Sequence, residues 1–193
     1  MKSPATLIAP LLGVLLLALA GSAVAAIDDD EPPIQVQVKK SGALIIVDAD
    51  FSVAVTPRLA WEVLTDFDHM ARFISNVQYS AVTVRQPGKL QVVQKGAATR
   101  GPLSFSFDSV RDIMLTPFEL ITTHLVSGNM KQLDGTTRLR TEGSGTHIVY
   151  HAESIPDTFV PPLVGTAFIA AESRHQFEEM RIEMLKRKAA AAP

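Results

Sequence analysis

The clearest pattern in the chain is a long alternation of apolar and polar residues between positions 44 and 55. Asp48, Asp50 and Ser52 fall on one face, and the apolar residues of the opposite face are Ile45, Val47, Ala49, Phe51, Val53 and Val55. A period of two is typical of a half-buried strand. A shorter alternation over residues 34–40 predicts an additional strand before it, with a turn at Ser41-Gly42.

The pattern then becomes helical for about twenty residues. Thr56 and Pro57 have the chemistry of an N-cap and a first helical position. Apolar residues follow at helical spacing, namely Ala60, Val63, Leu64 and Phe67. We expect Asp68 to cap a second short helix that ends near Asn76.

From residue 77 to 155 the chain consists of short runs rich in β-branched and aromatic residues. The runs are separated by turn-forming groups, at Pro87-Gly88, Gly101-Pro102, Thr116-Pro117, Asp134-Gly135 and Gly143-Ser144-Gly145. This spacing predicts an antiparallel meander. After Pro161-Pro162 nothing interrupts a final helix, from Leu163 to Lys188, that is apolar early and charged late. We therefore expect its first half to be buried.

This order of elements predicts an α+β fold in which a curved antiparallel sheet packs against one long C-terminal helix. A sheet and a helix of this kind rarely close tightly along their whole length. We therefore expect an elongated, mostly apolar cavity between them, which is the usual form of a small-molecule site.

The first 26 residues have the composition of a secretory signal peptide. Lys2 precedes an apolar run from Leu11 to Ala20 and the small residues Ala23-Val24-Ala25. An uncleaved anchor is the alternative, but the run is short for a membrane span. Export to a bacterial periplasm is our expectation. The predicted boundaries are a leader over 1–26, an arm and extra strand over 27–43, one domain over 44–188 and a frayed tail over 189–193.

Charge and cysteine content exclude several classes of function. Removing Lys2 from the 18 basic residues leaves 17 against 20 acidic ones, a net charge of −3, without the clustered basic face that nucleic acid requires. The absence of cysteine excludes disulfides, thiol nucleophiles and a lipoprotein anchor. His147 and His151 lie four positions apart, but on a strand that spans about 13 Å. We predict no metal site and no cofactor, and the oligomeric state cannot be read from the sequence.

Strand alternation selects candidate residues for the cavity. Tyr150 shares a face with Ile148 and Ala152, and His124 shares one with Thr122 and Val126. The two polar side chains either orient a ligand oxygen or are satisfied polar groups of the core or rim. The predicted ligand-binding set is Phe105, Phe107, Phe118, Leu120, His124, Tyr150 and Phe168. No residue is predicted to be catalytic.

Three stretches resemble the START-like superfamily of polyketide cyclases, dehydrases and lipid-transport proteins. They are VAVTPRLAWEVLTDFDHMARFISNV, GNMKQLDGTTRLRTEGSGTHIVYHAE and the long final helix. The resemblance as a whole extends over about residues 44–188. Within the superfamily the chain looks closest to the coenzyme Q-binding branch. The resemblance implies a helix-grip fold around a pocket for a lipid, a quinone or a polycyclic compound. The superfamily has no fixed catalytic motif, so no catalytic role is transferred.

Three functions are open from the sequence. The leading hypothesis is an exported binding or carrier protein for a hydrophobic small molecule. The second is a cyclase/dehydrase-like enzyme that uses His124 or Tyr150 as a general acid or base. The third is a partner- or membrane-facing module without a ligand, which predicts exposed apolar residues around 158–163 and a cavity filled by side chains. The first hypothesis also allows transient membrane contact.

The acidic stretch WEVLTDFDHMARF is interpreted as a structural junction rather than a catalytic cluster. Asp68 should cap the second helix, because aspartate is favoured at that position. Asp66 should satisfy backbone groups at the end of the first helix, and Trp61 should pack with Phe67. His69 should follow in the first turn of the second helix.

Overall fold

A computed structural model describes residues 31–100, 103–162 and 164–192. Residues 31–193 form one unit. Its elements are β1 (Gln35–Ser41), β2 (Leu44–Val53), α1 (Pro57–Leu64), the 3₁₀ helix η1 (Phe67–Arg72), β3 (Val77–Gln86), β4 (Lys89–Arg100), β5 (Leu103–Thr116), β6 (Leu120–Gly128), β7 (Met130–Glu142), β8 (Gly145–Pro156) and α2 (Val164–Ala190).

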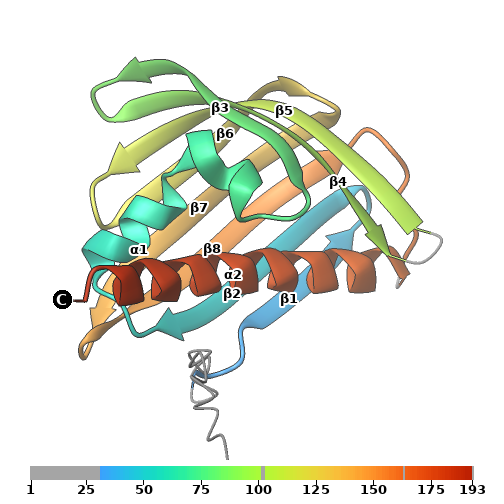
Figure 1. The fold of residues 1–193 in the computed structure, drawn as a ribbon. Coiled ribbons are helices and arrows are strands. Elements are labelled where there is room, and N and C mark those ends of the chain that lie inside the picture. Colours follow the sequence, from blue (N-terminus) through green and yellow to red (C-terminus); the bar gives the residue numbers. More distant parts are fainter. Residues whose placement is uncertain (1–30, 101–102, 163, 193) are drawn as a thin grey trace, which may run out of the picture. The chain divides into compact units, whose positions relative to one another are not determined.

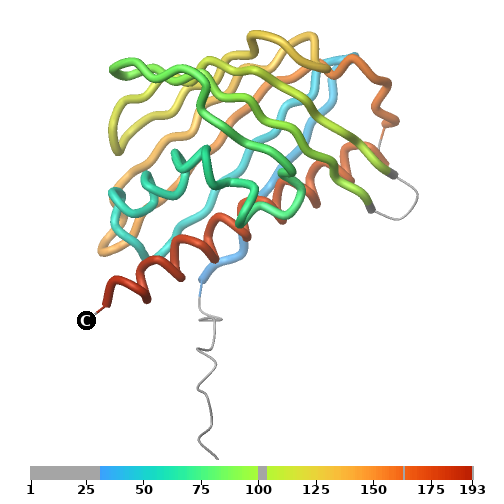
Figure 2. Tube along the Cα trace, turned by 45° about the horizontal axis from the view of Figure 1, so that its top comes forward, coloured from blue at the N-terminus to red at the C-terminus, as the bar shows by residue number. Residues whose placement is uncertain are grey.

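The eight strands form one antiparallel sheet that curves over helix α2. The strand order is β1-β2-β8-β7-β6-β5-β4-β3, and every pairing of neighbours is antiparallel. Helix α2 lies along the concave side, and the chain through α1 and η1 lies beside it near its C-terminal half (Figures 1 and 2). This arrangement confirms the predicted α+β, helix-grip architecture.

The apolar–polar alternation of residues 44–55 is confirmed in β2 and the two residues that follow it. All six apolar residues of that face are buried, from Ile45 to Val55. Strand β1 also alternates, with Val36 and Val38 turned toward the core and Gln35, Gln37 and Lys39 exposed. It pairs with β2 and forms one edge of the sheet.

Two expectations about the later elements are wrong. Asp134-Gly135 is not a turn, because β7 runs through both residues, and the chain reverses at Gly128-Asn129 instead. The Asn129 side chain holds that reversal by accepting from the Asp108 backbone N–H at 2.9 Å and donating to the Ser106 carbonyl at 2.9 Å.

The burial of α2 also differs from the prediction. Its buried residues, Gly165, Phe168, Phe177 and Met184, extend along the helix, while Val164 is exposed. Strands β1 and β2 and helix α1 all pack against α2, and burial continues into its charged half.

The start of α1 is confirmed and the start of the next helix is not. Thr56 Oγ1 accepts from the Leu59 backbone N–H at 3.3 Å, and Pro57 begins the helix. Asp68 caps nothing: its carboxylate accepts from the Val82 backbone N–H at 2.7 Å and pairs with Arg85 on β3. Its position inside η1 points it at the neighbouring strand.

Several sequence predictions fall outside the described residues. They are the signal peptide over 1–26, the start of the arm over 27–30, the turn at 101–102 and the position of residue 163. Within the described ranges, no helix is both long and apolar enough to cross a membrane.

Candidate ligand-binding cavity

A cavity of about 250 Å³ lies between the concave face of the sheet and the helices. Its apolar wall comes from α1, η1, the segment leading into β3, and α2. The residues of this wall are Leu64, Phe67, Met70, Ile74, Val77, Phe177 and Met180. Such a surface favours an apolar guest, because it offers contact without hydrogen-bond partners.

The opposite wall is formed by the sheet and carries a cluster of polar side chains. It contains Gln94 from β4, Ser109 and Arg111 from β5, Thr123 from β6, Thr137 from β7 and Tyr150 from β8. The sheet side also carries apolar residues, namely Phe107, Ile121, Met130 and Leu133, and α2 contributes Gln176. The polar groups are therefore concentrated on the sheet side of a mostly apolar cavity.

Arg111 is the charged group of this wall. Its guanidinium donates a hydrogen bond to the Gln94 side-chain oxygen, while its Nε atom is buried and has no hydrogen-bond partner in the described part of the chain. Burial lowers the pKa of Arg111, although an arginine remains protonated in proteins. The wall thus holds a cation in a poorly solvated place.

Gln94 holds the arginine in a defined orientation. Its amide nitrogen donates to Ser80 Oγ at 3.0 Å and to Met70 Sδ at 3.1 Å. These contacts fix which end of the amide is the oxygen, and that oxygen faces Arg111. Gln94 is itself buried, so each of these bonds replaces one that water would make.

Tyr150 brings a neutral hydroxyl to the same wall. Burial raises the pKa of its phenol above 10.0, and the positive charge of Arg111 opposes only part of that shift. Its ring packs edge-on against Phe177 of α2, with centroids 5.1 Å apart. At neutral pH this side chain is a hydrogen-bond donor and not a base.

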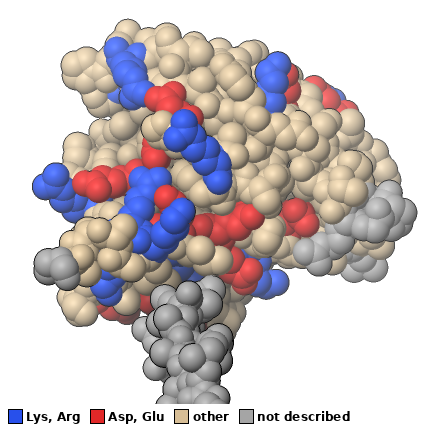
Figure 3. Space-filling model, viewed as in Figure 1, with Lys and Arg blue, Asp and Glu red and all other residues tan. Residues whose placement is uncertain are grey.

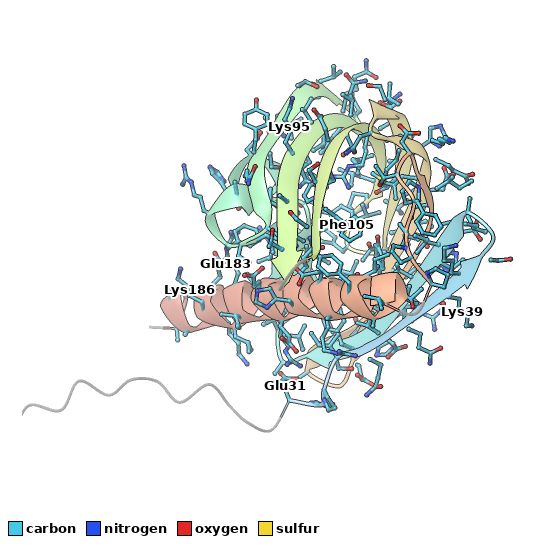
Figure 4. All side chains as sticks on the ribbon, turned by 90° about the vertical axis from the view of Figure 1, so that its right-hand side faces the viewer. Glu31, Lys39, Lys95, Phe105, Glu183 and Lys186 are labelled. Carbon is cyan, nitrogen blue, oxygen red and sulfur yellow. The ribbon has the colours of Figure 1, made fainter. Side chains whose placement is uncertain are left out.

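The predicted ligand-binding residues are divided among three places. Phe107 and Tyr150 line the cavity. Phe105 and Phe168 pack on each other with ring centroids 5.0 Å apart (Figure 4, which shows Phe105 directed toward α2), and Phe105 also packs in a cluster with Val160 and Ile169. Phe118 and Leu120 line a separate hollow beside α1.

The expectation that His124 faces the cavity is wrong. Its side chain is 70% exposed on the outer face and pairs with Asp134 at 2.6 Å. Ile121 and Thr123 face the cavity in its place. The odd-numbered and the even-numbered positions of the FELITTHLV stretch both contain apolar residues. In addition, Val126 has no partner in the pairing with β5, which shifts the register there. For these reasons, alternation alone selected the wrong face.

The other histidines of the described chain also lie away from the cavity lining. His151 Nδ1 lies 2.7 Å from Asp48 and His147 Nδ1 lies 3.1 Å from Ser52 Oγ, on the outer face of β2 and β8. Their outward orientation was predicted from the alternation of β8. Within the described ranges, no three His, Cys, Asp or Glu side chains are grouped as metal ligands.

The charged side chains of the junction after α1, Asp66, Asp68 and His69, lie outside the cavity lining, although Leu64, Phe67 and Met70 of the same stretch contribute to it. Asp66 accepts from His69 Nδ1 at 2.7 Å and from Arg187 of α2 at 2.8 Å, so it does not satisfy backbone groups as expected. Trp61 was expected to pack with Phe67, and its ring instead packs edge-on against Phe118, with centroids 5.9 Å apart. Charged side chains of both signs gather over this end of the molecule (Figure 3). The junction is therefore structural, as interpreted from the sequence.

Arg111 and Gln94 were missed, although the sequence contained a signal for both. Continuing the alternation of Phe105 and Phe107 through Ser109 places Arg111 on the inner face. The same step from Leu90 and Val92 places Gln94 there. A charged or amide residue on an otherwise apolar face is the informative exception, because such groups are rarely buried without a reason.

The apolar 158–163 segment gives mixed support to a module without a ligand. Phe159 is 78% exposed, as that hypothesis requires. The cavity, however, is open space rather than a core filled by side chains. The second observation counts against the hypothesis.

Comparisons with known proteins agree with this architecture. Solved structures with the same fold include the Zhui aromatase/cyclase from Streptomyces sp. R1128 (TM-score 0.65, 17% identity, 78% of this chain and 99% of that one). A STAR-related lipid transfer protein from Xanthomonas axonopodis also matches (TM-score 0.65, 13% identity, 80% and 95%). A START superfamily protein from Mycobacterium smegmatis is a third (TM-score 0.62, 14% identity, 73% and 97%).

Sequence comparison gives the family itself. No curated protein matches the chain significantly. Residues 53–181 match the family described as polyketide cyclase / dehydrase and lipid transport, and this range contains α1, η1, all strands from β3 to β8 and most of α2. The chain therefore belongs to the polyketide cyclase / dehydrase and lipid transport family.

Proposed function

We propose that this chain is an exported protein that binds or carries a hydrophobic small molecule in its internal cavity. The observation that carries the proposal is the cavity of about 250 Å³ whose helical side is apolar apart from Gln176. Transfer of apolar surface from water to that wall stabilises a complex by about 25 cal/mol per Å². The polar wall then fixes the orientation of the guest.

Cavity size restricts what fits without movement. A protein cavity of roughly 150 Å³ holds benzene, so 250 Å³ accommodates about ten non-hydrogen atoms. A larger lipid, quinone or polycyclic compound would extend beyond this volume, unless α2 or a neighbouring loop moves outward. The membership of the family and the leader-like first 26 residues support a carrier that acts after export. Exposed Phe159, beside the start of α2, is the candidate for transient membrane contact.

Native mass spectrometry after mild purification tests this function. The expected result is a protein peak with added mass that disappears on organic extraction, together with an apolar compound in the extract. A protein that is consistently empty and does not respond to small apolar compounds would contradict the proposal.

An enzyme of the cyclase/dehydrase kind is the second candidate. One observation favours it: Tyr150, a protonated phenol, and Arg111, a cation, lie in the same cavity wall. Such groups can donate to and stabilise an oxygen on which negative charge develops. His124 lies on the outer face, so Tyr150 is the general acid of the proposed enzyme and His124 has no catalytic role in it. Turnover of a polyketide substrate that is lost in Tyr150→Phe would support it, and unchanged turnover in that variant would contradict it.

A further inference from the structure

Arg111 is a buried cation to which the described part of the protein offers no carboxylate. The hydrogen bond that it makes goes to a neutral amide oxygen, and Nε makes none. A guanidinium has five N–H donors. Because Nε is buried, the terminal nitrogens of Arg111 are the ones that can donate to a guest in the cavity. Buried charges in proteins are normally paired, because an isolated one is costly to remove from water.

The nearest carboxylates in the sequence are held elsewhere. Asp112 and Asp108 alternate with Arg111 along β5 and therefore face the outer side of the sheet. There Asp112 pairs with Lys89 at 2.7 Å and Asp108 with Lys95 at 2.9 Å. Neither can turn inward without breaking the strand, so the protein does not supply the missing anion from this element.

The other polar groups that line the cavity with Arg111 are neutral. They come from every element that contributes to the polar wall and from α2, and are Gln94, Ser109, Thr123, Thr137, Tyr150 and Gln176. Several of these can donate a hydrogen bond to an oxygen placed beside the guanidinium. The wall thus combines one positive charge with hydroxyl and amide donors, a combination that matches a carboxylate.

We propose that the ligand is a small amphiphile with a carboxylate head and an apolar body, and that Arg111 is the counter-ion of the head. The carboxylate lies on the sheet side between Arg111 and Tyr150. The apolar body lies against Phe67, Met70 and Phe177, on the helical side. This inference rests on the proposed binding function and specifies its ligand class.

A matched pair of ligands tests the head group in the unaltered protein. Octanoate has a size that fits the cavity, and octanamide has the same shape without the charge. Isothermal titration of the delipidated full chain should give octanoate an affinity roughly 30-fold or more above that of octanamide, since removing one member of a buried charge pair has at least that effect. This comparison needs no variant.

The variant Arg111→Met then assigns the preference to this residue. It should lose the preference for octanoate while octanamide binds as well as before or better. Arg138→Met is the control, because Arg138 is an exposed arginine on the outer face of β7. It should leave both affinities unchanged.

The outcomes separate this inference from the proposed function. Equal affinities for octanoate and octanamide in the wild type would overturn the carboxylate head and leave a cavity for neutral apolar ligands. A preference that persists in a folded Arg111→Met variant would overturn the role of Arg111. If neither ligand binds and native mass spectrometry finds an empty protein, both the inference and the proposed function fail.

Discussion

Arg111 of β5 donates a hydrogen bond to Gln94 of β4, and both side chains lie in the wall of the internal cavity. Gln94 is paired with Ser109 across the two strands, so Arg111 is its diagonal neighbour on the inner face. The pair places a fixed positive charge opposite an apolar surface. We therefore expect an amphiphilic ligand to bind in one orientation, with its polar end at Arg111.

The first prediction concerns the coupling of this pair. Gln94→Met should lower the free energy of unfolding by about 1–3 kcal/mol, because it leaves the buried guanidinium without its acceptor. The double variant Gln94→Met/Arg111→Met should recover part of that loss, since replacing a whole buried polar pair by apolar groups is tolerated better than breaking it. Urea unfolding of the four proteins measures both effects.

A glutamine on the other face provides the control for this cycle. Gln91 donates to Asp112 at 3.2 Å on the outer side of the sheet. Gln91→Met should change stability by no more than about 0.5 kcal/mol. Strictly additive effects of the two inner substitutions would show that Arg111 does not depend on Gln94.

The second prediction concerns the link between Asp66 and Arg187. Burial alone would raise the pKa of Asp66, but hydrogen bonds from Arg187 and His69 bring it below the ordinary 3.8. A lowered folded-state pKa stabilises the protein above that value and the contribution is lost as the pH falls below it. Asp66→Asn should therefore destabilise at pH 7 by roughly 1 kcal/mol, the upper range for partly exposed pairs.

Measuring unfolding at pH 7 and below pH 3.8 checks the sign of this effect. The difference between wild type and Asp66→Asn should shrink at the lower pH. Glu62→Gln, which removes an exposed pair with Arg58 on α1, should have little effect at either pH. A gap between wild type and Asp66→Asn that widens on acidification would contradict the assignment.

The third prediction concerns the phenol of Tyr150. Because burial raises its pKa above 10.0, this tyrosine should remain protonated when an exposed one ionises. The chain has two tyrosines, and Tyr79 is exposed. Absorbance titration at alkaline pH should show a late component that Tyr150→Phe removes and Tyr79→Phe leaves in place. A late component that persists in Tyr150→Phe would contradict the assignment.

The fourth prediction concerns the close approach of β4 to β3. A Cβ on Gly96 would lie 2.0 Å from the Asn76 carbonyl oxygen and 2.4 Å from the Phe107 ring. Gly96→Ala should therefore destabilise by about 2 kcal/mol or more, since backbone must shift. Gly135→Ala is the control, because its Cβ would first meet the His151 carbonyl at 3.4 Å. Thermal unfolding of both variants measures the difference, and equal losses would contradict it.

The sequence predicted those strands whose two faces differ strongly. Val47 and Phe51 of β2 alternate with Asp48 and Asp50, so the buried face was unambiguous. For β6, alternation could not show which residues face the core, because Leu120 and Ile121 are both apolar. The pairing of β6 with its neighbouring strands determines the face, and Ile121 is buried.

The helical junction was predicted in position but not in its contacts. A cap depends on local sequence, and Thr56 behaves as expected. The partners of Asp66 and Asp68 are Arg187 and Arg85, which are distant in sequence. A single sequence contains no information on which distant side chains meet, so these contacts required the structure.

In the candidate site, too, some residues could be predicted from the sequence and others were found only in the structure. Tyr150 and Phe107 were found because alternation placed them inward, and the structure lines the cavity with both. Arg111 was not considered, because charged residues are expected at the surface. Its inward position follows from the same alternation and is the feature that gives the cavity its polarity.

The most direct test of a ligand in this cavity is to fill the cavity and measure binding. Gly135 lines it from β7, and its neighbour Thr136 faces the other way in the strand. Octanoate titrated into the wild type should bind at one site per chain. Gly135→Leu, folded by circular dichroism, should bind roughly tenfold more weakly or not at all, whereas Thr136→Leu should bind as the wild type does. Undiminished binding to a folded Gly135→Leu protein would show that the ligand lies elsewhere.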